Sequence, residues 1–253
     1  GVCKLAEYLE PKVLYAGDSA VTIEFGDSID IKVNARVQQL RQFIDRGQFN
    51  GVVELVPTYR SLTVYFDPVR VGDVAPFFER LKKLAADTKG EVPKGGLIIV
   101  IPVCYGGEFG PDMQNVIDHT GLSEEEIIKR HTAVDYYCYM LGFTPGFSYL
   151  GGMDESLATP RLKEPRKVIP AGSVGIAGKQ TGIYPIDSPG GWQLIGRTPL
   201  KLFDPEGQPP FLIDAGMWVR FRSIDRKEYD EIASQVAART YKPEILTKSG
   251  DAK

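Results

Sequence analysis

The chain has 253 residues, of which 43% are hydrophobic and 25% charged, the composition of a globular protein with a sizeable core. Its 30 basic and 33 acidic residues give a net charge of −3, so no overall basic field attracts nucleic acid or an anionic membrane. Its three cysteines stand far apart and it has only two histidines, which excludes a disulfide framework, a cysteine zinc site and HExxH chemistry.

The chain's N-terminus shows no signal-peptide pattern, and its longest apolar run is the size of a strand, too short for a transmembrane helix. We therefore expect a cytoplasmic protein with reduced thiols, no bound metal, and no nucleic acid or membrane partner. The 27 glycines and 18 prolines exceed the usual share and predict many tight turns.

The first ninety residues show the periodicities of a small α+β domain. Alternating apolar and polar residues predict half-buried strands, whereas apolar residues spaced three and four apart predict amphipathic helices. Strands are predicted over 19–25, 52–56 and 62–66, and helices over 33–44 and 74–84. This order, β-α-β-β-α, predicts a ferredoxin-like domain whose helices pack on a mostly antiparallel sheet.

A segment rich in charge, glycine and proline, Thr88–Gly96, follows the second predicted helix and is the best candidate for a domain boundary. We therefore predict a first domain over 1–92, a second domain over 93–241 and a flexible tail over 242–253. No long internal repeat and no low-complexity segment divides the chain further.

The second domain begins with a continuous apolar run, 97–103, which suits a strand buried on both faces. Ser123 and Glu126 form a capping box that starts a helix at about residue 124. A stripe of apolar residues with His131 continues from there to Leu141, and Gly142 supplies the expected stop.

Short apolar runs between glycine- and proline-rich turns follow, as far as Pro210, and they predict a β-rich barrel or sandwich. A late strand is predicted over 219–224. Asp225 and Glu228 then cap a final helix that extends to about Arg239.

No nucleotide or nucleophile motif is complete. The segment PAGSVGIAGKQT has five residues between Gly172 and Gly178, one more than a P-loop allows, and Gln180 takes the place of the hydroxyl residue. Ser148 lies in a string one residue too long for a GxSxG elbow. Turn glycines of a β-rich domain explain these segments as well as any catalytic loop does.

Two features remain open between a structural and a functional interpretation. His131 is either a satisfied core histidine or a polar group that faces a ligand. The loop GFTPGFSYLGG that follows the stripe is either self-packed or the wall of a pocket that includes Phe143, Phe147 and Tyr149. A basic cluster, from Arg161 to Lys167, is likewise either a solvated face or an anion site.

Taken together, several strings in the chain resemble one family. These strings are YGGEFGPD at Tyr105–Asp112, His131 with GFTPGFSYLGG, PAGSVGIAG from Pro170, QTGIYP from Gln180, and SPGGWQLIGRTP from Ser188. They are similar to the allophanate hydrolase subunit 1 family, whose members include the B subunit of 5-oxoprolinase and the sporulation-kinase inhibitor KipI. The resemblance spans nearly the whole chain and implies an N-terminal ferredoxin-like domain followed by a C-terminal cyclophilin-like β-barrel.

The resemblance also implies a part in a bacterial ATP-dependent 5-oxoprolinase, whose A, B and C subunits together open the lactam of 5-oxoproline to glutamate. A chain in the place of the B subunit would contact the C subunit directly. ATP is used by that complex, and because no P-loop is present, we expect the nucleotide to bind elsewhere in the complex or in a nonstandard way.

Residue roles follow from the resemblance as hypotheses. His131 is expected to be a polar contact or a proton-transfer group, and Arg166 or Arg197 to clamp the substrate carboxylate. Three residues are expected to orient the amide: Gln180, Tyr184 and Ser188. Two glycines are expected to permit close backbone approach, Gly190 and Gly191. The pocket wall is expected to consist of Phe143, Phe147, Tyr149 and Trp192.

Two alternatives stay open. The first is an inhibitor that docks on a sensor histidine kinase through an exposed apolar patch of the C-terminal domain. The second is a subunit of an enzyme that processes urea or allophanate. The fold does not separate these alternatives, because related chains share the same glycine-rich framework.

Overall fold

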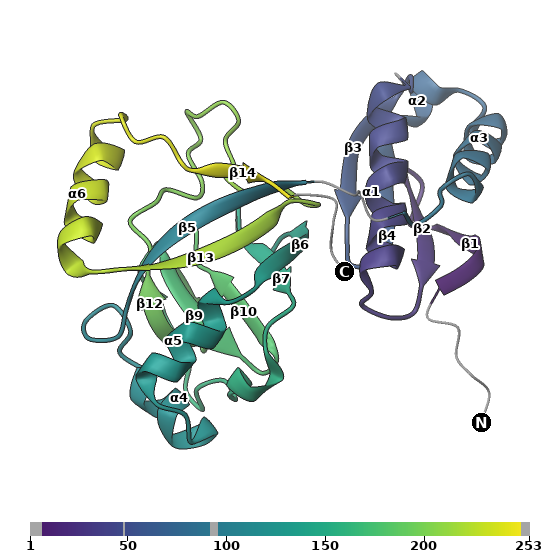
Figure 1. The fold of residues 1–253 in the computed structure, drawn as a ribbon. Coiled ribbons are helices and arrows are strands. Elements are labelled where there is room, and N and C mark those ends of the chain that lie inside the picture. Colours follow the sequence, from purple (N-terminus) through teal and green to yellow (C-terminus); the bar gives the residue numbers. More distant parts are fainter. Residues whose placement is uncertain (1–6, 48, 92–95, 249–253) are drawn as a thin grey trace, which may run out of the picture. The chain divides into compact units, whose positions relative to one another are not determined.

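The structure, a computed structural model, describes residues 7–47, 49–91 and 96–248, and it divides into two compact units, Gly1–Pro93 and Lys94–Lys253 (Figure 1). The boundary predicted after residue 92 falls within 92–95, outside the described residues. Each unit has its own buried core, so each is described by itself.

The described residues of the N-terminal unit form a four-stranded antiparallel sheet with helices packed against it. Its elements are β1 (Glu7–Tyr15), β2 (Ala20–Gly26), α1 (Ile31–Arg46), β3 (Val52–Pro57), β4 (Ser61–Phe66), α2 (Pro68–Val71) and α3 (Val74–Ala86). The strand order is β1-β2-β4-β3. The predicted β-α-β-β-α unit is therefore present in ferredoxin-like order, and the remaining edge position is taken by β1, a strand that the sequence analysis missed.

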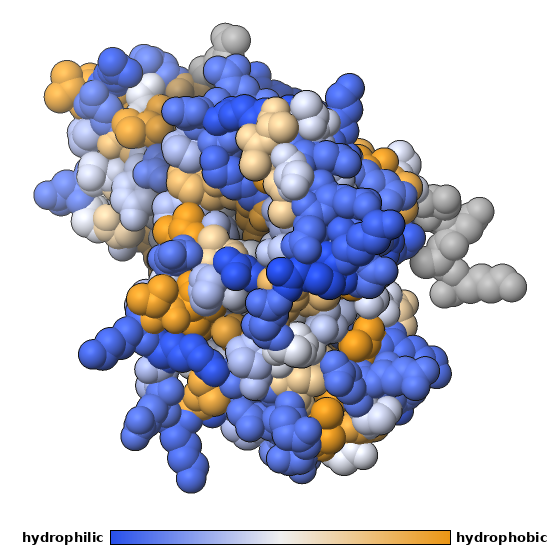
Figure 2. Space-filling view, turned by 90° about the vertical axis from the view of Figure 1, so that its left-hand side faces the viewer, coloured by the Kyte–Doolittle hydropathy of each residue, from blue (hydrophilic) through white to orange (hydrophobic). Residues whose placement is uncertain are grey.

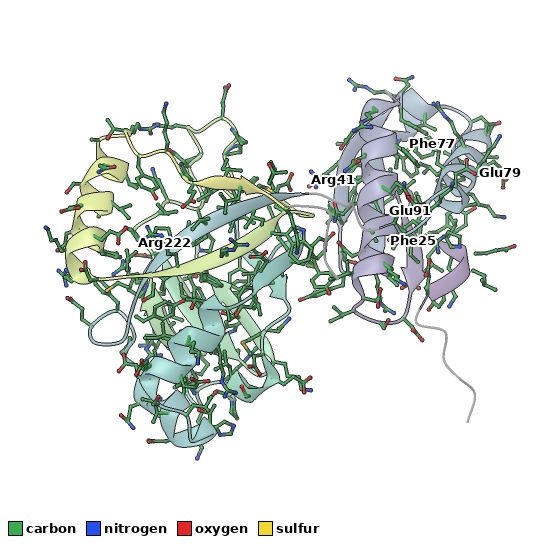
Figure 3. All side chains as sticks on the ribbon, in the orientation of Figure 1. Phe25, Arg41, Phe77, Glu79, Glu91 and Arg222 are labelled. Carbon is green, nitrogen blue, oxygen red and sulfur yellow. The ribbon has the colours of Figure 1, made fainter. Side chains whose placement is uncertain are left out.

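Local sequence explains where these helices begin and what they bury. The Asp30 carboxylate accepts hydrogen bonds from the backbone N–H groups of Lys32 and Val33 and so caps α1. Phe25 of β2 and Phe77 of α3 belong to the core between the sheet and the helices (Figure 3). The apolar residues that define the helix and strand periodicity of this region are therefore the residues that form its buried faces.

In the C-terminal unit, seven of the described strands close into a barrel in the order β5-β12-β9-β10-β7-β6-β13, with β13 beside β5 again. These strands are β5 (Leu97–Tyr105), β6 (Asp135–Leu141), β7 (Ser148–Gly151), β9 (Ser173–Ala177), β10 (Gln180–Ile183), β12 (Gln193–Arg197) and β13 (Trp218–Ile224). The α+β class and the cyclophilin-like barrel are confirmed.

The other elements surround this barrel (Figure 1). They are α4 (Met113–Thr120), α5 (Glu124–Thr132), the 3₁₀ turn η1 (Glu155–Leu157), β8 (Arg166–Ile169), β11 (Ser188–Gly190), α6 (Arg226–Ala237) and β14 (Ile245–Thr247). Strands β8 and β11 pair only with each other and form a separate two-stranded ribbon. The helix predicted after Asp225 is confirmed as α6, and the Asp225 carboxylate accepts from the Glu228 N–H.

One edge of β5 is shared between two partners. Its C-terminal end, at Cys104 and Tyr105, pairs with β12 and closes the barrel, whereas Leu97–Ile99 pairs with β14. The prediction that the whole range 242–253 is a flexible tail differs from this arrangement, because residues 245–247 are a paired strand and only 249–253 lie outside the described residues. Three residues added to an open strand edge give too short a pattern for sequence periodicity to detect.

The predicted helix from residue 124 to Leu141 is wrong in its second half. The Ser123 hydroxyl caps α5 as expected, but α5 ends at Thr132 and Asp135–Leu141 forms β6. The residues of this segment also alternate with the period of two of a strand, and the structure follows that pattern. Tyr136 and Cys138 enter the barrel core, whereas the rings of Tyr137 and Tyr139 pack on each other outside this core.

Barrel closure leaves no space for a side chain at Gly196. A Cβ atom there would lie 2.7 Å from Val103 Cγ1 and 2.9 Å from the Cys104 carbonyl oxygen, across the β12–β5 closure. We predict that Gly196→Ala lowers the free energy of unfolding by about 1–3 kcal/mol through overpacking. At Gly191, the nearest atom to such a Cβ is 3.6 Å away.

Urea denaturation of the two alanine variants provides the measurement. Gly191→Ala is the matched control, and its free energy of unfolding should stay within about 0.5 kcal/mol of the parent value. Equal stability of the two variants would contradict this account of barrel closure.

Candidate functional site

His131 lies inside the barrel with both ring nitrogens hydrogen-bonded. Its side chain is fully buried, and its Nδ1 and Nε2 atoms each lie 2.8 Å from a hydroxyl oxygen, that of Tyr105 and that of Thr181 respectively. The imidazole also packs on the Phe221 ring at a centroid distance of 4.5 Å. This environment is that of a satisfied core histidine.

The direction of the hydrogen bonds fixes the tautomer of His131. Because the Thr181 hydroxyl donates to the Gly175 carbonyl oxygen at 3.1 Å, it must accept from the Nε2–H of His131. The Nδ1 atom then accepts from the Tyr105 hydroxyl. Burial lowers the pKa of His131 to about 3, so the ring is neutral at physiological pH and both of its nitrogens are occupied.

The four predicted wall residues do come together, on the outer side of the barrel sheet. The Phe147 ring lies at the centre, with the centroids of four other rings 5.2–5.7 Å away. These five rings, which we call the outer aromatic cluster, are Phe143, Phe147, Tyr149, Tyr184 and Trp192.

Strand alternation separates this cluster from the barrel interior. On β10, Thr181 bonds His131 and Ile183 lies in the barrel core, whereas a Cβ at Gly182 would touch the rings of Trp192 and Phe147. The absence of a side chain at this position lets the rings lie directly on the sheet. His131 and the outer aromatic cluster are therefore on opposite faces of the same strands.

The loop between β6 and β7 carries three unusual features. Phe143 adopts a left-handed backbone with φ of 65° and is 64% exposed, which is rare for a bulky residue. Among the described residues, the buried hydroxyl oxygens of Thr144 and Ser148 have no hydrogen-bond partner. Strain and unpaired buried polar atoms gather at functional segments more often than elsewhere.

Arg166, a predicted carboxylate clamp, is occupied by an internal carboxylate. Its Nη1 and Nη2 atoms donate to the two oxygens of Asp112 at 2.9 and 2.7 Å, and the Leu194 N–H donates to the same carboxylate at 2.7 Å. The Asp112 side chain is only 5% exposed. This bidentate pair fastens the β8–β11 ribbon to the barrel.

Ser188, one of the predicted amide-orienting residues, lies on the same ribbon, with Gly190 also on it and Gly191 directly after it. Ser188 is buried and donates to the Ile186 carbonyl oxygen at 3.2 Å, and Gly190 pairs with Arg166 across the ribbon. A Cβ at Gly190 would lie 2.3 Å from the Tyr184 hydroxyl oxygen, so glycine here makes room for a side chain of the chain itself. The Gly191 carbonyl oxygen accepts from the Leu162 N–H at 2.7 Å.

Tyr184 is buried, and Gln180 begins β10 with its side chain half-buried. Burial raises the pKa of Tyr184 to about 12, against the opposing effects of the Trp192 backbone and of Arg161 and Arg166. The phenol is therefore a neutral hydrogen-bonding group. The glycine-rich segment from Pro170 forms the β9–β10 hairpin, with no helix after its last glycine.

Arg197 stands apart from these groups, at the end of β12. Its Nε atom donates to the Ala171 carbonyl oxygen at 3.0 Å, and the residue lines a cavity against α6. The structure thus brings the aromatic residues and the ribbon together, but it leaves His131 inside the barrel and Arg197 at a separate place.

Sequence reasoning missed two residues of these sites. Asp112 belongs to the string YGGEFGPD, but nothing in that string indicates that its carboxylate binds Arg166. Tyr229 lines the cavity beside Arg197, and its position on α6 gives no sequence signal.

Two further kinds of site, a metal centre and a membrane span, are absent from the residues that the structure describes. Among them, no group of three or more His, Cys, Asp and Glu side chains is placed to hold a metal ion. None of the described helices combines the length and the apolar character that a membrane span requires.

The family model that matches the chain is that of the carboxyltransferase domain, subdomains C and D, and it covers residues 11–213. Among curated proteins, the 5-oxoprolinase B subunit of Bacillus subtilis is 49% identical, over 84% of this chain and 92% of that protein. A protein of the same name from Escherichia coli O157:H7 is 43% identical, over 84% of this chain and 94% of that protein.

Among solved structures, urea amidolyase of K. lactis superimposes with a TM-score of 0.75 over 97% of this chain. The match covers 17% of that much longer chain, at 20% sequence identity. At this identity the similarity is one of fold.

The buried neutral state of His131 predicts a pH dependence of stability. Its folded pKa of about 3 lies below the ordinary value of 6.5, so between these values the unfolded chain binds a proton that the folded chain does not. Stability should therefore fall as the pH drops from 6.5 towards 3, by up to about 1.4 kcal/mol per pH unit from this group. In His131→Leu this contribution should be absent, so its unfolding free energy should change less steeply. Parallel pH profiles for the two proteins would show that His131 is not held neutral.

The Arg166–Asp112 pair predicts a measurable coupling energy. In a double-mutant cycle with Arg166→Met and Asp112→Asn, we expect a coupling of at least about 1 kcal/mol in unfolding free energy, because one partner is buried. The Lys179–Glu155 pair makes a similar contact, at 2.8 Å, but its side chains are 70% and 76% exposed, and it serves as the matched control. Its coupling should stay below about 1 kcal/mol. Additive effects of the two ribbon substitutions would exclude the proposed fastening.

Proposed function

The chain belongs to the carboxyltransferase domain family of subdomains C and D, and from this membership we propose that it is the B subunit of an ATP-dependent 5-oxoprolinase. The observation that carries the proposal is the 43–49% identity to proteins named as 5-oxoprolinase B subunits, over most of both chains. In this role the chain acts together with the A and C subunits, and the C subunit is its direct partner.

The proposed reaction couples lactam opening to ATP hydrolysis because a lactam amide is a poor electrophile. Transfer of the γ-phosphoryl group to the amide oxygen would release ADP and make the carbonyl carbon reactive. Water then adds to that carbon, the C–N bond breaks with proton transfer to the nitrogen, and a second water hydrolyses the resulting acyl phosphate to glutamate and phosphate. ATP binding is assigned to the complex, since the segment most like a P-loop in this chain is the β9–β10 hairpin.

The geometry favours a different division of roles from the one expected from the sequence. His131 has no free ring nitrogen and lies inside the barrel, which supports a structural role. Arg166 is held by Asp112, which leaves Arg197 as the better candidate for a substrate carboxylate. The outer aromatic cluster, with Phe143 exposed at its edge, is proposed to face the partner chain.

The kinase-inhibitor alternative requires an exposed apolar patch on the C-terminal unit. The exposed large apolar side chains among its described residues are Leu97, Phe143, Val168 and Ile245. Leu97 and Ile245 lie on the paired strands β5 and β14, and the other two lie on separate segments. Figure 2 shows mostly hydrophilic side chains with small, separate apolar patches on the face that carries α6. This alternative therefore has less support than the role as part of an enzyme.

Omission reconstitution tests the proposal. Glutamate formation from 5-oxoproline and ATP is measured with the A and C subunits, with and without this chain. We predict that turnover requires the chain and that ADP and glutamate form in equal amounts. Turnover that is the same without the chain would contradict the proposal, and urea or allophanate as the preferred substrate would favour the second alternative. The kinase-inhibitor alternative is tested by measuring the autophosphorylation of a sensor kinase while the chain is added in increasing amounts.

A further inference from the structure

A cavity of about 220 Å³ lies in the C-terminal unit between α6 and the segment that follows β12. The lining residues on one side are Arg197 at the end of β12, then Thr198 and Lys201, and those on the other side are Tyr229, Ala233 and Val236 of α6. Pro185, Pro199 and Leu200 complete much of the remaining wall. The cavity therefore has a mainly apolar wall with a few polar groups, as small-molecule sites do.

The polar groups of this cavity favour an anion. Arg197 and Lys201 both line it, whereas none of its described lining residues is Asp or Glu, although acidic residues outnumber basic ones in the chain. Lys201 also contacts Asp204, at 3.4 Å, so Arg197 is the stronger anchor. Excess positive charge in a partly apolar wall attracts a carboxylate more strongly than the same charge in open solvent.

The Arg197 side chain is held by a hydrogen bond in an orientation that suits carboxylate binding. Its Nε atom donates to the Ala171 carbonyl oxygen, which fixes the plane of the guanidinium group. No contact within the described part of the chain occupies its Nη atoms, which are the pair that grips a carboxylate at two points. Arg166, in contrast, has both Nη atoms on Asp112.

Tyr229 adds a hydrogen-bond donor to the wall. Burial raises its pKa, with Arg197 acting in the opposite direction, so the phenol keeps its proton at neutral pH. Its ring packs on Phe109 with centroids 4.3 Å apart. Arg222 of β13, labelled in Figure 3, pairs with Glu228 of α6 at 2.7 Å and links the helix to the barrel.

We propose that this cavity binds a small monocarboxylate with an apolar body, with the carboxylate on the Nη atoms of Arg197 and the apolar part against Ala233 and Val236. The identity of that monocarboxylate as 5-oxoproline rests on the proposed function. The two ring methylene groups of 5-oxoproline supply the apolar part and its carboxylate the charge. The cavity is then the substrate-binding site of this chain, separate from both His131 and the outer aromatic cluster.

Binding to the whole chain is measured by titration calorimetry with three probes. L-5-Oxoproline carries both ring and carboxylate, 2-pyrrolidinone carries the ring alone, and acetate carries the carboxylate alone. We expect the dissociation constant of 5-oxoproline to be at least tenfold lower than that of either fragment. Equal or absent binding of all three probes would overturn the proposal.

Two variants locate the site, and one controls for changes in the helix. Arg197→Gln should weaken 5-oxoproline binding at least tenfold, and Ala233→Leu should do the same by filling the cavity while Arg197 stays intact. Ala237→Leu makes the same change on α6 at an exposed residue outside the cavity and should leave binding unchanged. Undiminished binding by folded Ala233→Leu would place the ligand elsewhere and overturn the proposal, as would an equal loss in Ala237→Leu.

Turnover of the same variants in the reconstituted complex separates this proposal from the proposed function. If the complex turns over 5-oxoproline and Ala233→Leu does so at the parental rate, the cavity proposal fails while the role in the complex stands. If the chain binds monocarboxylates at the cavity but the complex lacks activity, the role in the complex fails while the site stands.

Discussion

The C-terminal unit is organised by one constraint: a closed seven-stranded barrel must fill its own interior with side chains. Large side chains occupy that interior, including Tyr136, Phe221 and Ile101, all almost fully buried. A polar group can remain there only if its hydrogen bonds are satisfied. His131 meets this condition through Tyr105 and Thr181, and it remains neutral as a result.

The packed core of the barrel therefore favours ligand and partner contacts on the outer surface. Glycine at position 182 lets aromatic rings lie directly on the sheet, and the β8–β11 ribbon is fastened nearby by Arg166 and Asp112. Residues of α6 and of the segment after β12 line the open cavity beside Arg197. The barrel therefore acts as a rigid support for two outer sites, one aromatic and one cationic. Sites supported in this way keep their geometry without the help of a bound ligand.

The elements that the sequence predicted well are those whose signal is local. The capping residues Asp225 and Ser123 and the apolar stripe of α1 each act within a few turns of chain. The apolar stripe as far as Leu141 wrongly predicts one continuous helix, because its spacings of three and four extend into residues that form a strand with a period of two. The bond between His131 and Thr181 spans 50 residues and the Arg166–Asp112 pair spans 54, so one sequence without relatives contains no trace of either.

The site residues divide in the same way. The aromatic residues near position 147 were recognised as a group because they are close in sequence, and the structure brings them together with Trp192 and Tyr184. Whether an arginine is free or already paired depends on distant carboxylates, so Arg166 and Arg197 were indistinguishable until the fold was known. The proposed reaction rests on identity to named relatives, whereas the proposed site rests on the geometry of this chain.

A crystal structure of the chain with L-5-oxoproline tests the central claim most directly, because it shows on which side of the barrel wall the ligand lies. The account predicts electron density for the ligand between Arg197 and α6, with the Tyr105–His131–Thr181 hydrogen bonds unchanged. Density against the imidazole of His131, with the barrel interior opened to admit it, would contradict the account.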